Sequence, residues 1–593
     1  MNFISNQANS FQSQVKPLEA VIAVGDKPVW KEPRLVGDWV IWLEQRPLEG
    51  GRTTALIKPW FKPNCIPQEL TPAPINIRSR VHGYGGGALS VEHTSNEVLL
   101  IWIDDCDGCL WSQTWEILEE PQDQSKYLKQ FNKPFCLSKK ANYLLADGQI
   151  DKRRKRWIGI MEDHEKDYLV QFSLNQESAD PLIIYQPKDF LGYLALSPDG
   201  NALAWVEWQS PSMPWDASQL WLALLDDLGK FSNTFLLAGQ NFQEQKSISV
   251  FQPVWLPNGE IVVSEDANGW SNLMISETPQ KIDEFNYWKR LWPMNAEVSM
   301  PQWVYGMSTI SAAGNKIAAL ICEEGTWQIS LLTKDGFVQS LDQPFNDLQG
   351  IDAQGERLVS IASNSFNESG LLEFNLNNSN WEFSLAREPL MVQEQISKAI
   401  SFWFEGFQGM QTHAWYYPPV KSDKKLAPLL VTSHSGPTSM ASLGLDLEIQ
   451  FWTSRGWGVV DVNYGGSTGF GRSYRQRLKN GWGKVDVFDC AAAAKALISA
   501  GKTDKNLVAI QGGSAGGFTT LASLCFTDVF RVGACSYPVC DLISMSKSTH
   551  RFEKNYLEHL VGPLPEYKNL YHERSPYQHV NNIKCPVIFF HGL

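Results

Sequence analysis

The chain has 593 residues, a formal net charge of -13 at pH 7 and an isoelectric point near 5.4. This length implies two or more domains, and the acidic balance argues against a nucleic-acid or anionic-membrane partner. No apolar run reaches transmembrane length, and residues 1–16 lack the regions of a signal peptide, so the default expectation is a cytoplasmic protein. The ten cysteines mostly lie in apolar contexts, which suits reduced, buried thiols.

Residues 25 to about 380 read as many short strands with little helical periodicity. A unit of strand, glycine-containing turn and strand recurs, with turn glycines at positions 200, 259, 314 and 355 that are 41 to 59 residues apart. This spacing is close to the ~40 to 50 residues of a four-stranded propeller blade. More divergent units occupy Pro33–Gln45, Leu89–Trp111 and Tyr143–Asp163. The sequence therefore predicts a β-propeller of about seven blades, with six or eight as alternatives.

Three features in this half of the chain could be taken for functional sites. The motif Cys106-Asp-Gly-Cys109 has no second cysteine pair at zinc spacing, and Asp-Gly between apolar runs predicts a hairpin turn. The basic tract Lys152–Arg156 lies between two strand-like runs and is interpreted as a solvated hairpin tip rather than a nucleic-acid signal. The glycine-rich run from Arg80 to Gly87 is read as a tight turn, in which His82 or Tyr84 could also line a ligand path.

Strand repeats give way to a polar connector near residues 377–395, and strands then alternate with helices. This change predicts three parts: an N-terminal segment (1–24), the propeller (25–380) and an α/β domain (381–593). Ligands of such domains bind at the carboxyl ends of the parallel strands. The elements expected here are a hairpin (399–407 and 410–417), strands at 428–433, 458–463, 507–511 and 586–590, and helices at 440–454 and 484–500.

The stretch from Asn506 to Thr520 is typical of a nucleophile elbow. An apolar strand runs directly into a helix, and Ser514 lies at the turn between them. Gly512 and Gly516 flank this serine and let the strand and the helix approach closely. We expect the turn to hold the Ser514 hydroxyl above the sheet, beside the free N–H groups of the helix N-terminus.

A second G-x-S-x-G motif occurs at Gly465–Gly469, with Ser467 at its centre. It also follows a plausible strand, but Gly469 and Gly471 stand where a first helical turn is needed. Ser514 is instead followed by an apolar helix face. The sequence therefore favours Ser514 over Ser467 as the nucleophile.

Together, the propeller and the segment Gly512-Gly-Ser514-Ala-Gly-Gly517 make the chain similar to the prolyl oligopeptidase family of serine peptidases, in particular its acylaminoacyl-peptidase and dipeptidyl-peptidase-like branch. That branch's His-Gly-Gly-Pro stands here as His434-Ser435-Gly-Pro. The resemblance implies an α/β-hydrolase fold, no cofactor and no metal. It also implies that Ser514 is the nucleophile and that the Ala515 and Ser435 backbone N–H groups are the oxyanion donors. Other branches carry a tyrosine hydroxyl at the position of His434.

In the family, the catalytic Asp and His follow a strand that ends in His-Gly, which corresponds here to Cys585–Leu593. Both partners are therefore expected beyond Leu593, and we expect residues 1–593 to be a C-terminally incomplete, essentially inactive form. Asp541 is interpreted as a cap or turn residue. The histidines after Ser514 are interpreted as non-catalytic; they are His550, His559, His572, His579 and His591.

Three functions remain open from the sequence. The first is a serine peptidase that cleaves short peptides, with the propeller excluding larger folded proteins. The second is a carboxylesterase or another acyl hydrolase, because an elbow does not distinguish esters from amides. The third is a non-catalytic propeller scaffold. The predicted propeller favours the peptidase, because a plain esterase rarely needs so large a domain to restrict access to its active site.

Overall fold

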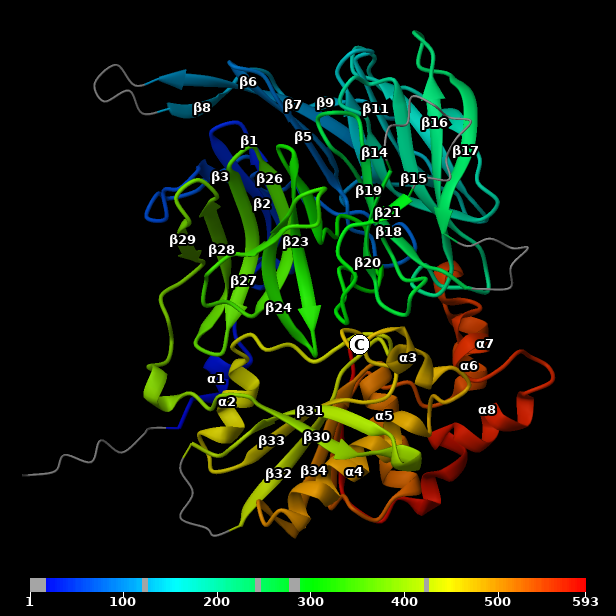
Figure 1. Ribbon diagram of the computed structural model, residues 1–593. Coiled ribbons are helices and arrows are strands. Elements are labelled where there is room, and N and C mark those ends of the chain that lie inside the picture. The colour runs from blue at the N-terminus through cyan, green and yellow to red at the C-terminus, as the bar shows by residue number, and fades with distance from the viewer. Residues whose placement is uncertain (1–16, 120–125, 240–246, 277–287, 421–425, 593) are drawn as a thin grey trace, which may run out of the picture.

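A computed structural model describes residues 17–119, 126–239, 247–276, 288–420 and 426–592. Residues 1–16 of the expected N-terminal segment and Leu593 lie outside these ranges. Figure 1 shows two bodies, a β-propeller above and an α/β domain below. No helix in the described ranges is long and apolar enough to cross a membrane; α4 (Val485–Ser499) has 15 residues.

Seven antiparallel sheets, six with four strands and one with five, form the propeller in the described ranges, so the predicted fold class and blade number are confirmed. The turn glycines at 200, 259, 314 and 355 join the first two strands of blades four to seven, and all have positive φ. The blades are, in order, β1–β4 (Val29–Val36, Trp39–Arg46, Arg52–Pro59, Gln68–Glu69); β5–β8 (Leu89–His93, Glu97–Ile103, Leu110–Glu119, Lys126–Gln130), with β9 (Phe135–Cys136) beside β7; β10–β13 (Leu144–Asp151, Arg156–Glu162, Asp167–Ser173, Leu182–Tyr185); β14–β17 (Phe190–Leu196, Ala202–Trp208, Ser218–Leu225, Phe231–Gly239); β18–β21 (Val250–Trp255, Ile261–Glu265, Asn272–Ser276, Trp288–Arg290); β22–β25 (Ile310–Ala313, Lys316–Glu323, Thr326–Leu332, Val338–Ser340); and β26–β29 (Asp347–Gln354, Arg357–Asn364, Asn367–Asn375, Asn380–Leu385).

Bulges in the first strands of several blades join neighbouring blades around the propeller axis. Each bulge contains a residue with positive φ, namely Glu32, Asp147, Tyr193, Gln252 and Gly350. The Asp147 carboxylate accepts the N–H of Leu194 in the next blade at 3.2 Å, and the Gln252 side chain accepts that of Ile310 at 3.1 Å. The bulges thus turn polar side chains of one blade toward the backbone of the next.

Side chains close the ring where blade seven meets blade one. Asp352 accepts the Leu35 N–H at 2.8 Å, and the Lys58 ammonium donates to the Glu373 carboxylate. Lys58 and Glu373 are 1% and 0% exposed. Because both charges are buried, removal of either Lys58 or Glu373 would leave the other without a partner. The closure of the ring therefore depends on both residues.

The basic tract and the C-x-x-C motif both form turns, as predicted, but the tract is only partly solvated, because the Arg154 and Arg156 side chains are 7% and 5% exposed. Lys152–Arg156 joins β10 to β11. There, Arg154 and Arg156 pair with Asp151 at 3.0 and 2.9 Å. Arg153 pairs at 2.8 Å with Asp227, which lies in the turn that follows β16 in blade four. Cys106–Cys109 forms the turn between β6 and β7, with Gly108 at φ 74°.

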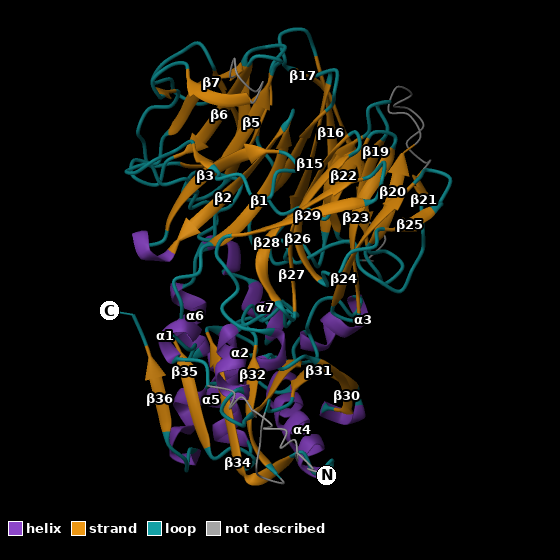
Figure 2. Cartoon of the chain, turned by 90° about the vertical axis from the view of Figure 1, so that its left-hand side faces the viewer, coloured by secondary structure: helices purple, strands orange, loops and turns teal. Residues whose placement is uncertain are grey.

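A seven-stranded sheet forms the α/β domain, in the order β30-β31-β33-β32-β34-β35-β36. Its strands from β33 to β36 run parallel, and helices cover the sheet on both sides (Figure 2). The strands are Ile400–Glu405, Gln411–Tyr417, Ala427–Ser433 (β32), Gly458–Asn463 (β33), Thr503–Gly513 (β34), Val532–Ser536 and Val587–Phe590. The helices besides α4 are α2 (Leu447–Thr453), α3 (Arg472–Arg475), α5 (Ala515–Phe526), α6 (Leu542–Ser548), α7 (Tyr556–Leu560) and α8 (Lys568–Arg574).

The helix predicted at 440–454 is only half correct, because α2 begins at Leu447. Asp446 caps it by accepting the N–H groups of Glu448 and Ile449, at 2.7 and 3.1 Å. An aspartate N-cap fixes a helix start, so the residues before it form a loop.

The two bodies dock through the segment between α6 and α7. Phe552 stacks on His82 of the propeller at 5.3 Å between ring centroids, and Arg551 lies 2.7 Å from Asp167 and 3.3 Å from Glu162. His82, Glu162 and Asp167 are close enough together to hold a metal ion. Because the Arg551 guanidinium already pairs with both carboxylates, we interpret the cluster as an ion-pair network between the domains.

The N-terminal segment also bridges the domains. Its short helix α1 (Ala20–Ala23) lies beside α2 in Figure 1. The Leu18 N–H donates to the Ser454 hydroxyl at 3.2 Å, and Asp26 pairs with Arg387 of the propeller at 3.0 Å. The segment therefore runs from the α/β domain to blade one along the side of the interface.

Candidate active site

Ser514 occupies a sharp turn between β34 and α5. Its backbone has φ 52° and ψ -119°, a conformation that non-glycine residues rarely adopt. A Cβ atom on Gly512 would lie 2.4 Å from the Gly516 carbonyl oxygen, and one on Gly516 would lie 2.2 Å from that of Ser433. Both positions therefore require glycine, and the local geometry is that of the predicted elbow.

Among the backbone N–H groups near Ser514 that have no hydrogen-bond acceptor in the described part of the chain, two are the expected oxyanion donors. One belongs to Ala515, the first residue of α5, which has no intrahelical acceptor. The other belongs to Ser435, in the turn after β32, whose side chain donates to the Gly513 carbonyl at 2.8 Å. Free donors on two sides of a serine can stabilise an anionic oxygen.

The second G-x-S-x-G motif does not form an elbow. Ser467 is 0% exposed, and only the four-residue helix α3 follows it. Its hydroxyl lies 2.7 Å from Nε2 of His434. A hydroxyl buried in this way is closed to a substrate, and Ser514 stays the predicted nucleophile.

None of the described histidines after Ser514 bonds to its hydroxyl, for which the described residues offer no hydrogen-bond partner. His550 lies 3.6 Å from Glu553, and His559 lies 3.8 Å from Asp216. The His579 ring packs edge-on against Phe526. Asp541 caps α6 by accepting the Ile543 N–H at 3.2 Å, which confirms its predicted role.

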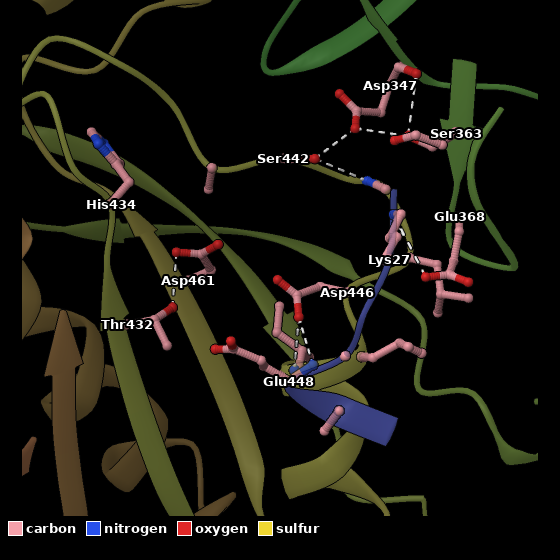
Figure 3. Close-up of a pocket in the computed structure, with 18 of the residues that line it drawn as sticks. Lys27, Asp347, Ser363, Glu368, Thr432, His434, Ser442, Asp446, Glu448 and Asp461 are labelled. Carbon is pink, nitrogen blue, oxygen red and sulfur yellow. Dashed lines mark hydrogen bonds and ion pairs between the residues drawn. The ribbon is translucent and has the colours of Figure 1, made fainter. Parts of the chain in front are cut away.

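A polar cavity of about 640 Å³ lies between the domains and reaches the elbow. Ser435, in the turn after β32, and Gly512, two residues before Ser514, form part of its wall. Figure 3 shows carboxylates from both domains around it, including Asp347, Asp446 and Asp461. Asp461 accepts the Thr432 hydroxyl at 2.8 Å. Burial is the main cause that raises the pKa of Asp461 to about 7, and the charge of Asp446 adds to it.

We expect Asp461→Asn to raise stability at pH 8 but not at pH 4. The folded pKa lies above the unfolded value of 3.8, so the folded state binds more protons between about pH 4 and 7. The stability contribution of this carboxyl is therefore lost as pH rises through that window. Urea unfolding at pH 4, 6 and 8 tests this, with the exposed Asp528→Asn as control. An equal effect of Asp461→Asn at all three pH values would contradict a raised pKa of Asp461.

A second interdomain cavity, of about 430 Å³, is lined mainly by apolar and aromatic side chains, among them Trp303, Tyr305 and Met440. It shares Asp347 and Met440 with the polar cavity. Tyr84 also lines it and donates to Glu553 at 2.6 Å, whereas His82 is buried in the docking contact. Of the two candidates in the glycine-rich turn, only Tyr84 therefore borders open space.

His434 and Tyr464 pack against each other beside this site, a contact that the sequence did not predict. Their rings stack at 4.2 Å between centroids, and Tyr464 is 0% exposed. The two residues are far apart in the sequence and follow different strands, β32 and β33. Their shared position at the carboxyl edge of adjacent parallel strands is the signal that could have placed them together.

Comparisons with known proteins agree with this architecture. The sequence profile of the prolyl oligopeptidase family matches residues 443–593. The acylamino-acid-releasing enzyme of Arabidopsis thaliana is 30% identical over 180 residues, which cover 29% of this chain and 24% of that protein. Dipeptidyl aminopeptidase BIII of Pseudoxanthomonas mexicana is 30% identical over 171 residues, covering 28% and 25%. The matches thus span about a quarter of these curated relatives.

The similarity to one solved structure extends over nearly the whole chain. A puromycin-hydrolyzing peptidase of Mycobacterium tuberculosis superposes with a TM-score of 0.87 at 30% identity, and the match covers 96% of this chain and 87% of that one. The elbow, the propeller and this match lead to one conclusion: the chain belongs to the prolyl oligopeptidase family of serine peptidases.

Proposed function

We propose that Ser514 is the nucleophile of a peptidase that hydrolyses short peptides. The observation that carries this proposal is the strained elbow, which presents Ser514 between the free N–H groups of Ala515 and Ser435. The apolar cavity between the domains offers room for peptide side chains, and the propeller limits the size of what enters. Several relatives are named as peptidases, which supports an amide as the bond cleaved.

The reaction is acyl transfer. Ser514 Oγ forms a bond to the substrate carbonyl carbon, its proton passes to a base, and the carbonyl oxygen becomes an anion held by the two N–H groups. The C–N bond then breaks as the base returns the proton to the leaving amine. Water releases the acyl group from Ser514 by the same steps.

We propose further that residues 1–593 alone turn over slowly, because no described histidine bonds to Ser514. A serine hydroxyl is a weak nucleophile at neutral pH without a neighbouring base. Positioned bases contribute about 10²- to 10⁴-fold, so added imidazole should recover part of this, about 10-fold or more.

The test measures hydrolysis of aminoacyl amides, acyl-aminoacyl amides and simple esters at pH 7.5, with and without imidazole. We expect amide cleavage that rises with imidazole and depends on Ser514. Cleavage of esters but not of amides would instead identify an acyl hydrolase. Fast hydrolysis that does not depend on imidazole would show that a base lies within the chain. His550, His572 and His579 would then be the first residues to replace.

A further inference from the structure

A cavity of about 630 Å³ lies on the propeller where blades seven, one and two meet. Two tryptophan and two proline side chains of blade one line it, namely Trp39, Trp60, Pro59 and Pro63. Pro59 is the partner of Trp39 across strands β2 and β3, and the backbone N–H of Trp60 donates to the Asp38 carbonyl at 2.9 Å. The backbone ladder of blade one therefore holds the aromatic wall of the cavity in place.

The cavity lies on the face of the propeller that points away from the α/β domain. It borders the turn between β1 and β2, which carries Asp38, and the start of β27 at Arg357. The turns at the opposite ends of the strands meet the α/β domain. One of them, between β23 and β24, carries Gly325, and a Cβ atom on that glycine would lie 3.3 Å from the Phe470 ring. The length of the blade strands thus separates the cavity from Ser514.

The rim of this cavity is basic, although the chain as a whole carries a net charge of -13. Lys62, Lys126 and Arg357 contribute three positive charges, and Asp38 is the one carboxylate among the lining residues. Asp38 lies 3.1 Å from Lys126 and 2.9 Å from Arg357, and hydrogen bonds from both lower its pKa. Lys62 has no ion-pair partner in the described part of the chain. Three positive charges and one negative charge leave the lining with a net charge of +2 at neutral pH.

Arg357 joins the basic rim to the aromatic wall. Its guanidinium carbon lies 5.2 Å from the centroid of the Trp60 ring. The charged groups remain open to solvent, since the Arg357 and Lys126 side chains are 34% and 42% exposed. A ligand in this cavity therefore meets indole surface and positive charge at the same time.

The chemistry of the lining selects one kind of occupant. Aromatic-lined grooves bind proline-rich segments, which are already extended and lose little conformational freedom on binding. Carboxylates pair with guanidinium and ammonium groups, whereas a basic segment would be repelled by a net charge of the same sign. A segment with both prolines and carboxylates matches the wall and the rim together.

We propose that this cavity docks an extended, proline-containing segment of a partner protein that carries carboxylate side chains. The prolines lie against the indole rings of Trp39 and Trp60. The carboxylates pair with Lys62, Lys126 and Arg357. Docking on this face leaves the α/β domain free, so the partner binds whether or not Ser514 acts on a substrate.

The test measures the binding of three synthetic peptides by fluorescence anisotropy at low ionic strength. The first repeats Glu-Pro-Pro, the second Lys-Pro-Pro and the third Glu-Ala-Ala, and all three carry the same label and are blocked at both ends. We expect the Glu-Pro-Pro peptide to bind about 10-fold or more tightly than the other two. Added salt should weaken its binding, because the ion pairs are partly exposed.

Two variants test the two halves of the cavity. Trp60→Ala should weaken the Glu-Pro-Pro peptide about 10-fold or more, because aromatic anchors carry most of the energy of such contacts. Lys62→Glu, at an exposed position, lowers the net charge of the lining from +2 to zero and should weaken this peptide about 3- to 10-fold. Trp403→Ala is the matched control, because it removes a partly exposed indole from the α/β domain and should leave binding unchanged.

Equal binding of all three peptides, or no binding of the Glu-Pro-Pro peptide, would overturn the proposal. Equal affinity for Glu-Pro-Pro and Glu-Ala-Ala would overturn the role of the indole rings, and unchanged binding in Lys62→Glu would overturn that of the basic rim. Should Trp60→Ala fail to fold, Lys62→Glu and the peptide comparison decide the question. Sedimentation of the chain alone covers the remaining occupant, since self-association that Trp60→Ala or Lys62→Glu abolishes would assign the cavity to a second copy and overturn the proposal.

Discussion

Ser514→Ala is expected to lower peptide hydrolysis to the level of the buffer blank, measured with imidazole supplied as the base. Removal of the nucleophile from a complete triad typically costs on the order of 10⁴-fold or more. The loss is expected because the elbow holds the Ser514 hydroxyl near the free N–H groups of Ala515 and Ser435. The strained φ of 52° at Ser514 belongs to this geometry. The oxyanion donors can then stabilise only the much slower direct attack of water, so the residual hydrolysis should lie close to the blank.

The matched variant is Ser467→Ala, which removes the hydroxyl of the other G-x-S-x-G motif. It should keep most of the Ser514-dependent hydrolysis, because the Ser467 side chain is buried and its hydroxyl is already hydrogen-bonded to His434. Loss of activity in Ser467→Ala together with persistence in Ser514→Ala would reassign the nucleophile.

Lys58→Met is expected to destabilise the propeller by about 3 to 5 kcal/mol, because it leaves the Glu373 carboxylate buried without its partner. Urea unfolding at pH 7.5 measures this. Burial already raises the pKa of Glu373 despite Lys58, so protonation of the orphaned carboxyl should make the loss smaller at pH 5.

Two further variants separate the buried charge from other effects. Lys58→Met combined with Glu373→Gln should recover most of the stability, because the amide oxygen can still accept the Phe61 N–H that Glu373 now accepts at 2.6 Å. Lys126→Met breaks an exposed pair with Asp38 and should cost less than about 1 kcal/mol. Equal losses for Lys58→Met and Lys126→Met would contradict the account of the seam.

Features that depend on neighbouring residues could be read from the sequence. The elbow at Ser514 follows from glycines within a few residues of the serine, and the blade turns follow from glycines that take positive φ. The parallel strands were predictable for a similar reason, since buried strands are short apolar runs. The predicted helix at 440–454 failed for a local reason too, because the Asp446 cap was not recognised as the helix start.

Features that join distant residues could not be read in this way. Ser467 and His434 are 33 residues apart and meet only because β32 and β33 are neighbours in the sheet. The docking contact between Arg551 and Asp167 joins residues 384 apart. At the bulges, Glu32 and Asp147 adopt positive φ without being glycine, and the next blade stabilises them.

The identity of the nucleophile is tested most directly by locating a covalent adduct. The protein is treated with a fluorophosphonate in imidazole buffer, digested with trypsin and analysed by mass spectrometry. Cleavage after Lys505 and Arg531 gives a peptide of residues 506–531 that contains Ser514, and cleavage after Arg455 and Arg472 gives residues 456–472 with Ser467. We predict the adduct on Ser514 in the first peptide. An adduct on Ser467, or one that remains in Ser514→Ala, would contradict the account.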